Sequence, residues 1–138
     1  MSPKLNEILL IDDSRADNFL HKRVVESAGV AERVTICFGA REALDYLADK
    51  SSGRYPCPDL IFLDINMPGM SGWDFMEAYQ KLPTEQCARL VICMLTASYA
   101  AEDRKKAEHY GVVGDYIHKP LSVERVNQIV ATYFSEDG

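Results

Sequence analysis

Residues 60–72 read LIFLDINMPGMSG, and this stretch decides the fold. Its apolar start, Leu60 to Leu63, is typical of a buried strand. The strand ends directly in the carboxylate of Asp64, and proline and glycine then turn the chain. Ligands bind at the carboxyl ends of strands in open parallel sheets, so Asp64 is the first candidate for a functional residue. A single acid in this position is also typical of a helix cap, so whether Asp64 is functional depends on which residues stand at the other strand ends.

Three further apolar runs end in chemically active side chains: residues 8–13 end in Asp12 and Asp13, residues 91–96 in Thr96, and residues 115–120 in Lys119 and Pro120. Carboxyl ends of parallel strands meet at one edge of a sheet. The four runs would therefore bring three carboxylates, a hydroxyl and an amine to the same place. Helix capping explains Asp12 or Asp13 alone, but it does not explain a lysine at a neighbouring strand end.

The rest of the chain alternates between strand and helix patterns. Expected strands cover residues 7–11, 34–38, 59–63, 90–95 and 114–117, and expected helices cover about 15–28, 40–48, 72–82, 98–110 and 123–134. Five strands alternating with five helices predict an α/β fold with a doubly wound parallel sheet. At 138 residues the chain is one ordinary domain. The turn-rich residues 51–58 are interpreted as a tolerated surface insertion.

Two expectations concern side chains of the first helix. Its apolar face is predicted from Ala16, Phe19, Leu20, Val24 and Ala28. Ser14, with Asp17 three residues later, predicts a capping-box-like start with Ser14 as N-cap, and Gly29 is the expected C-terminal cap. The three histidines share no metal-ligand spacing and are expected at the surface: His21, His109 and His118.

The ordered set of motifs resembles the receiver domain of bacterial two-component response regulators. It consists of the acid pair, Asp64 within D-x-x-M-P-x-x-x-G, Thr96-Ala97 and Lys119-Pro120. The resemblance covers roughly residues 6–134 of a single domain, 1–138, of the stand-alone, chemotaxis-regulator-like type. It implies a flavodoxin-like sheet of order 2-1-3-4-5. Only four residues follow Phe134, so no output domain is expected.

The resemblance also implies a role for each candidate residue. Asp64 would be phosphorylated, Lys119 and Thr96 would contact the phosphoryl group, and Tyr116 would be the aromatic switch residue. Asp13 and Asp64 would bind Mg²⁺ directly, Asp12 through water and Asn66 through its carbonyl. The Lys119–Pro120 bond would be cis.

Elementary chemistry agrees with these implied roles. Clustered carboxylates repel one another unless a cation joins them, and a few oxygen ligands suit Mg²⁺. A carboxylate can form an aspartyl-phosphate. An ammonium and a metal ion would neutralise the charge on the transferring group.

Composition limits the class of partner. The net charge of −6 argues against nucleic acid or an anionic membrane. The four cysteines lack C-x-x-C spacing, and Cys37 and Cys93 lie in apolar runs as expected of buried free thiols. No run approaches the length of a membrane span, so a cytoplasmic location is expected. The implied partners are a sensor histidine kinase or His-phosphotransfer protein and a downstream protein target.

The leading hypothesis is a phosphorylation switch that catalyses only its own phosphorylation and dephosphorylation. The simpler alternative is a phosphate-sink receiver, which drains phosphoryl groups from a kinase and needs no moving surface. An aspartyl-nucleophile phosphatase of the haloacid-dehalogenase type requires a second Asp two residues after the nucleophile, where this chain has Asn66. A flavodoxin-like electron carrier requires a phosphate-binding loop after the first strand, where Asp12 and Asp13 would instead repel an anion. A phosphorylation-silent interaction domain is disfavoured because every expected site residue is present.

Overall fold

The computed structural model describes residues 5–51, 53, 55–65, 67, 69–82, 90–92, 117 and 119–134. Its strands are β1 (Leu5–Ile11), β2 (Ala31–Cys37), β3 (Leu60–Leu63) and β4 (Leu90–Ile92). They pair in parallel in the order β2-β1-β3-β4. The predicted order is thus confirmed for these four strands. The expected helix over 98–110 and all but the last residue of the expected strand over 114–117 lie outside the described part.

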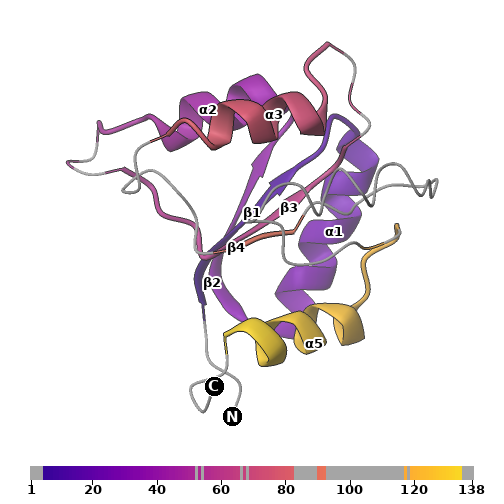
Figure 1. The fold of residues 1–138 in the computed structure, drawn as a ribbon. Helices are drawn as coiled ribbons and strands as arrows, with labels where there is room; N and C mark the ends of the chain where they lie inside the picture. The colour runs from indigo at the N-terminus through magenta and orange to yellow at the C-terminus, as the bar shows by residue number, and fades with distance from the viewer. Residues whose placement is uncertain are drawn as a thin grey trace.

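Helices cover both faces of the sheet, as a doubly wound α/β fold requires. They are α1 (Arg15–Ala28), α2 (Ala40–Leu47), α3 (Gly72–Tyr79) and α5 (Val123–Tyr133). Figure 1 shows α1 and α5 together against one face, with α2 and α3 together against the other. A parallel sheet covered on both faces needs apolar side chains on both. The central strands β1 and β3 meet this need, because Leu60 to Leu63 and Ile8 to Ile11 are fully buried.

Local sequence signals set the helix ends. Ser14 caps α1 by accepting the backbone N–H of Asp17 at 3.2 Å. Gly29 ends the helix in the left-handed conformation, φ 66°, which favours glycine. Ser71 caps α3 in the same way through the N–H of Asp74. The caps predicted for α1 are therefore confirmed.

The predicted apolar face of α1 is wrong in part. Phe19 and Leu20 are 64% and 46% exposed, whereas the helix buries Asn18, His21 and Val25. Spacings of three and four residues place these three on one helical stripe. The inward stripe is therefore largely polar, which hydrophobic patterning does not detect. His21, expected at the surface, is buried.

A hydrogen bond explains why α1 turns this polar stripe inward. The Asn18 side-chain amide donates to the backbone carbonyl of Asp12 at 2.7 Å. Asp12 follows the last residue of β1, and a buried carbonyl at the end of a strand needs a partner. Asn18 satisfies it, and helical periodicity then carries His21 to the same side.

The other three helices bury apolar residues. α2 buries Ala40, Ala43 and Leu47, α3 buries Phe75, Met76 and Tyr79, and α5 buries Val126, Ile129 and Val130. The helical spacing of apolar residues in α5 also predicts Tyr133 in the core, but this residue is 42% exposed. Cys37 is a buried free thiol as predicted, while Cys93 lies outside the described residues. Within the part of the chain that the structure describes, no helix has the length and apolar character to cross a membrane.

Candidate functional site

Strand register places Asp12 beside Asp64. β1 and β3 are paired up to Ile11 and Leu63, so the next residue along each strand is one of these acids. The ladder continues one step further, because the Asp64 N–H donates to the Ile11 carbonyl at 2.9 Å. On its other side, the Asp12 N–H donates to the carbonyl of Cys37 at 3.2 Å. Both acids are thereby fixed at the carboxyl edge of the sheet by backbone hydrogen bonds.

Three carboxylates meet at this edge. Asp12, Asp13 and Asp64 each place one oxygen within 4.8 Å of the others, with Asp12 and Asp64 buried and Asp13 exposed. Buried carboxylates this close repel one another unless a cation is present. The cluster therefore has the oxygen donors and the charge to hold a metal ion, and oxygen-only ligands favour a hard cation such as Mg²⁺.

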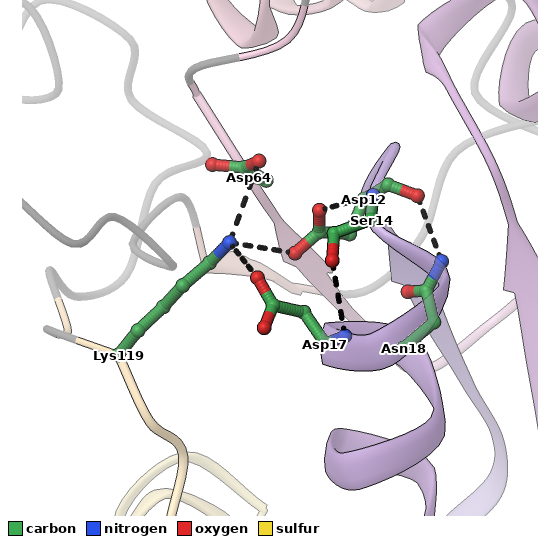
Figure 2. Close-up of polar contacts among 6 residues, drawn as sticks. All are labelled: Asp12, Ser14, Asp17, Asn18, Asp64 and Lys119. Carbon is green, nitrogen blue, oxygen red and sulfur yellow. Dashed lines mark hydrogen bonds and ion pairs between the residues drawn. The ribbon is translucent and has the colours of Figure 1, made fainter.

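One ammonium group faces this cluster. Lys119 Nζ lies 2.9 Å from Asp12 Oδ2 and 3.6 Å from Asp64 Oδ2. A third carboxylate is closer still: Asp17 Oδ2, from the first turn of α1, accepts a hydrogen bond from Nζ at 2.7 Å. Figure 2 shows the lysine reaching across from the segment before α5 to all three acids. The structure thus brings together four of the predicted site residues and adds Asp17.

The charges of this arrangement shift the pKa values of its members. Burial alone would lower the pKa of Lys119, but its hydrogen bonds with Asp17 and Asp12 and the charge of Asp64 raise it above the ordinary lysine value. The hydrogen bond from Lys119 lowers the pKa of Asp17. Lys119 is therefore held as an ammonium ion, and it supplies a permanent positive charge beside Asp64.

Asp17 is the residue of this site that sequence reasoning missed. The spacing of Ser14 and Asp17 predicted a helix cap, in which the acid would return to the backbone N–H of the serine. In the structure the Ser14 N–H donates instead to Asp12 Oδ1 at 2.9 Å. The Asp17 carboxylate is consequently directed to Lys119. The contact between Asp17 and Lys119 could be predicted only if it were known that Asp12, rather than Asp17, accepts the Ser14 N–H.

A short segment joins Asp64 to α3. Ile65 and Met67 are buried, and Gly69 has the positive φ of 78° that glycine tolerates best. At the other side of the site, the Lys119–Pro120 bond is cis, as the resemblance implied. Asn66, Thr96 and Tyr116 lie outside the described residues, so their predicted roles stay predictions.

Comparison with known proteins identifies the family. Residues 8–131 match the family model described as the response regulator receiver domain. The chain belongs to this family. The matched segment includes the three acids of the edge cluster and Lys119.

The curated relatives of this receiver are regulatory proteins of different kinds. The probable methanogenesis regulatory protein FilR2 of Methanothrix harundinacea is 28% identical over 123 residues, which cover 89% of this chain and 77% of that protein. The transcriptional regulatory protein CpxR of Escherichia coli is 32% identical over 118 residues, covering 86% of this chain but only 44% of that protein. The chain thus spans less than half of CpxR.

Solved structures agree on the receiver fold. A two-component response regulator from Cytophaga hutchinsonii superposes with a TM-score of 0.82 at 28% identity, covering 96% of this chain and 99% of that chain. A two-component response regulator from Legionella pneumophila gives a TM-score of 0.79 at 25% identity, covering 94% of this chain and 98% of that chain. Both are single chains of nearly the same extent as this receiver.

Proposed function

We propose that this receiver accepts a phosphoryl group on Asp64 and thereby switches a protein-binding surface. The donor would be the phosphohistidine of a sensor histidine kinase or a His-phosphotransfer protein. The proposal rests mainly on the position of Asp64. Its buried carboxylate has an oxygen 3.6 Å from the Lys119 ammonium and within 4.8 Å of oxygens from two further acids. Membership of the receiver family supports the same role.

The acid cluster supports a Mg²⁺ site in this proposal. Asp13 and Asp64 would bind the ion directly, Asp12 through water, and Asn66 through its backbone carbonyl. The cluster fits a hard cation, because it offers carboxylate oxygens and carries more negative charge than Lys119 alone can balance. When bound, the ion would neutralise charge on the transferring group. Removal of Asp64 would take away both a ligand and the phosphoacceptor.

The transfer itself needs one bond made and one broken. A carboxylate oxygen of Asp64 attacks the phosphorus, the P–N bond of the donor phosphohistidine breaks, and the electron pair returns to the imidazole. Lys119, already charged, stabilises the negative oxygens of the transferring group. The Thr96 hydroxyl would donate a hydrogen bond to one of those oxygens after transfer. The chain would catalyse only this transfer and its own dephosphorylation, in which water takes the phosphoryl group from Asp64 as inorganic phosphate, in contrast to an enzyme with an external substrate.

The output would be a change on the surface formed by the expected helix over 98–110, the expected strand over 114–117 and α5. A phosphoryl group adds charge and acceptor oxygens, so it favours the arrangement that brings Thr96 and Lys119 towards it. Tyr116 would follow Thr96 inward, and a downstream protein would bind the resulting surface.

The alternative is a phosphate sink, which drains phosphoryl groups and needs no such change. Amide chemical shifts after addition of beryllofluoride, a phosphoryl mimic, separate the two. Shifts over residues 98–118 support the switch, and shifts confined to the surroundings of Asp64 support the sink.

The phosphoacceptor is tested by incubation with Mg²⁺ and acetyl phosphate, followed by intact mass measurement. We expect a gain of one phosphoryl group that is acid-stable and base-labile. Asp64→Asn should abolish the gain while the protein stays folded. Asp45→Asn is the matched control, because Asp45 is an exposed acid on α2 whose ion pair within the described part of the chain is a 4.0 Å contact with Arg41. Undiminished labelling of Asp64→Asn would place the phosphoacceptor elsewhere.

A further inference from the structure

Lys119 has a carboxylate partner that does not belong to the acid cluster. Asp12 and Asp64 are members of the cluster, but Asp17 is not, and among these three carboxylates it nevertheless lies closest to Nζ, at 2.7 Å. Asp17 lies in the first turn of α1, 102 residues away in sequence. Figure 2 shows its carboxylate between the helix and the ammonium. The lysine is therefore tied to α1 as well as to the edge of the sheet.

The chain contains its own comparison for this contact. Ser71 and Asp74 have the same spacing at the start of α3, and there the acid completes the capping box by accepting the Ser71 N–H at 3.0 Å. At α1 the corresponding Ser14 N–H goes to Asp12, and Asp17 is free to contact Lys119. The same local pattern thus has two outcomes. The difference is that an ammonium group lies within reach of the first helix.

We propose that Asp17 is a positioning residue that holds the Lys119 ammonium in the unphosphorylated state and competes with the phosphoryl group for it. This proposal rests on the proposed phosphoacceptor function of Asp64. Mg²⁺ would offset the charges of Asp12 and Asp64, which belong to the cluster that would bind it. Asp17 lies outside the cluster and keeps its full negative charge. It therefore attracts Lys119 and repels an incoming phosphoryl group, and both effects favour the resting receiver.

Asp17 therefore makes the phosphorylated form less favourable than it would be in the same site without the Asp17 charge. Asp17 is 36% exposed, so solvent and salt weaken its influence. Partly exposed ion pairs are weak, and an effect on the order of fivefold on phosphoryl-mimic affinity is expected. The effect should shrink as ionic strength rises.

Beryllofluoride affinity measures this competition directly. Fluorine NMR titrations at saturating Mg²⁺ would compare wild type with Asp17→Asn, Asp17→Glu and Asp74→Asn. Asp17→Asn should bind beryllofluoride about fivefold more tightly. Asp17→Glu keeps the charge and should stay close to wild type. Asp74→Asn removes the equivalent first-turn acid from α3, away from Lys119, and should also stay close to wild type.

The outcomes separate the two proposals. If wild type does not bind beryllofluoride, the phosphoacceptor function itself is refuted, together with the role of Asp17 that depends on it. If wild type binds and Asp17→Asn binds equally or more weakly, only the competition is refuted. Equal tightening by Asp74→Asn would also refute it, because the cause would then be the loss of a helix-terminal acid.

A second measurement needs neither metal nor phosphoryl mimic. Urea unfolding without Mg²⁺ would compare Asp17→Asn in the wild-type background and in the Lys119→Met background. The substitution should lower the urea midpoint only when the lysine is present, because Asp17 has a positive partner only then. In the Lys119→Met background it should leave the midpoint unchanged or raise it, since it removes repulsion from Asp12. Equal losses in both backgrounds would contradict a tie between Asp17 and Lys119.

Discussion

The backbone N–H of Gly72 donates to the carbonyl of Ile65 at 3.2 Å, which ties the start of α3 to the residue that follows Asp64. A Cβ on Gly72 would lie 2.6 Å from Ile65 Cα and 2.8 Å from the Asp64 carbonyl oxygen. Both are backbone atoms, so no side-chain rotation could relieve the contact. The final glycine of the D-x-x-M-P-x-x-x-G motif is therefore required by close packing against the Asp64 backbone.

Gly72→Ala should consequently destabilise the receiver and displace Asp64. The expected loss in free energy of unfolding is about 1–3 kcal/mol, as for other overpacked sites, and phosphoryl labelling should slow. Gly39→Ala is the control, because a Cβ at Gly39 meets nothing within 4 Å among the described residues. Urea unfolding and the initial rate of acetyl phosphate labelling measure the two effects. A Gly72→Ala protein as stable as Gly39→Ala would show that the backbone can move apart at no cost.

Asp13 offers the clearest test of the metal site, because it is the exposed member of the cluster. Asp13→Ala removes a proposed ligand, so Mg²⁺ affinity measured by calorimetry should fall by roughly tenfold or more. The same change removes repulsion among the three carboxylates, so the metal-free variant should unfold at a higher urea concentration than wild type. Asp45→Ala serves as an exposed acid outside the cluster. Unchanged Mg²⁺ affinity would remove Asp13 from the ligand set.

His21 should make the receiver less stable in mild acid. Burial lowers the pKa of His21 below its ordinary 6.5, although the charges of Asp12 and Asp17 act in the opposite direction; the charge of Lys119 lowers it further. A depressed pKa means that the folded state favours the neutral ring. The resulting stability is present above pH 6.5 and is lost as the pH falls through the folded-state pKa.

His21→Leu should remove this loss. Neither ring nitrogen has a hydrogen-bond partner in the described part of the chain, so an apolar side chain of similar size fits the site. Urea midpoints at about pH 7.5 and about pH 5.5 would be compared. The wild-type midpoint should fall more between these values than that of His21→Leu. Parallel curves for the two proteins would assign the acid sensitivity to other groups.

Much of the fold was predictable because the signals are local. Apolar runs that end in acids specify β1 and β3, and the spacing of Ser14 and Asp17 specifies the start of α1. The parallel register then brings Asp12 and Asp64 together, so the centre of the site follows from strand ends alone. Element limits were less accurate: β2 begins at Ala31 rather than at the expected residue 34.

The misses share a physical cause. The buried positions of Asn18 and His21, and the contact of Asp17 with Lys119, depend on which groups remain without partners at the end of β1. Such satisfaction of individual donors and acceptors is a tertiary property, and hydrophobic periodicity carries no information about it. Glu7 is a further example. It stands in an apolar strand, is 1% exposed, and its position in the core was not predicted.

The Glu7 carboxylate is held in the core by hydroxyl groups from two neighbouring elements. Thr35 of β2 donates to Glu7 Oε2 at 2.6 Å, and the Tyr46 hydroxyl of α2 donates to the same oxygen. Arg33 adds an ion pair at 3.6 Å. Hydrogen bonds to charged groups are the strong ones, so Tyr46→Phe should lower the free energy of unfolding by about 1.5 kcal/mol. Tyr55→Phe, at a half-buried ring beside Lys50, is the control.

The Tyr46 contribution should also depend on pH in a defined window. Burial, followed by the hydrogen bond to Glu7, raises the pKa of Tyr46 from 10.0 to about 12. A raised pKa means that the folded state favours the protonated phenol, so its stabilisation is fully present below pH 10 and is lost as the pH rises from 10 towards 12. The difference in urea midpoint between wild type and Tyr46→Phe should therefore be constant near neutrality and shrink across this window. A difference that stays constant up to pH 12 would contradict a phenol held protonated by burial and Glu7.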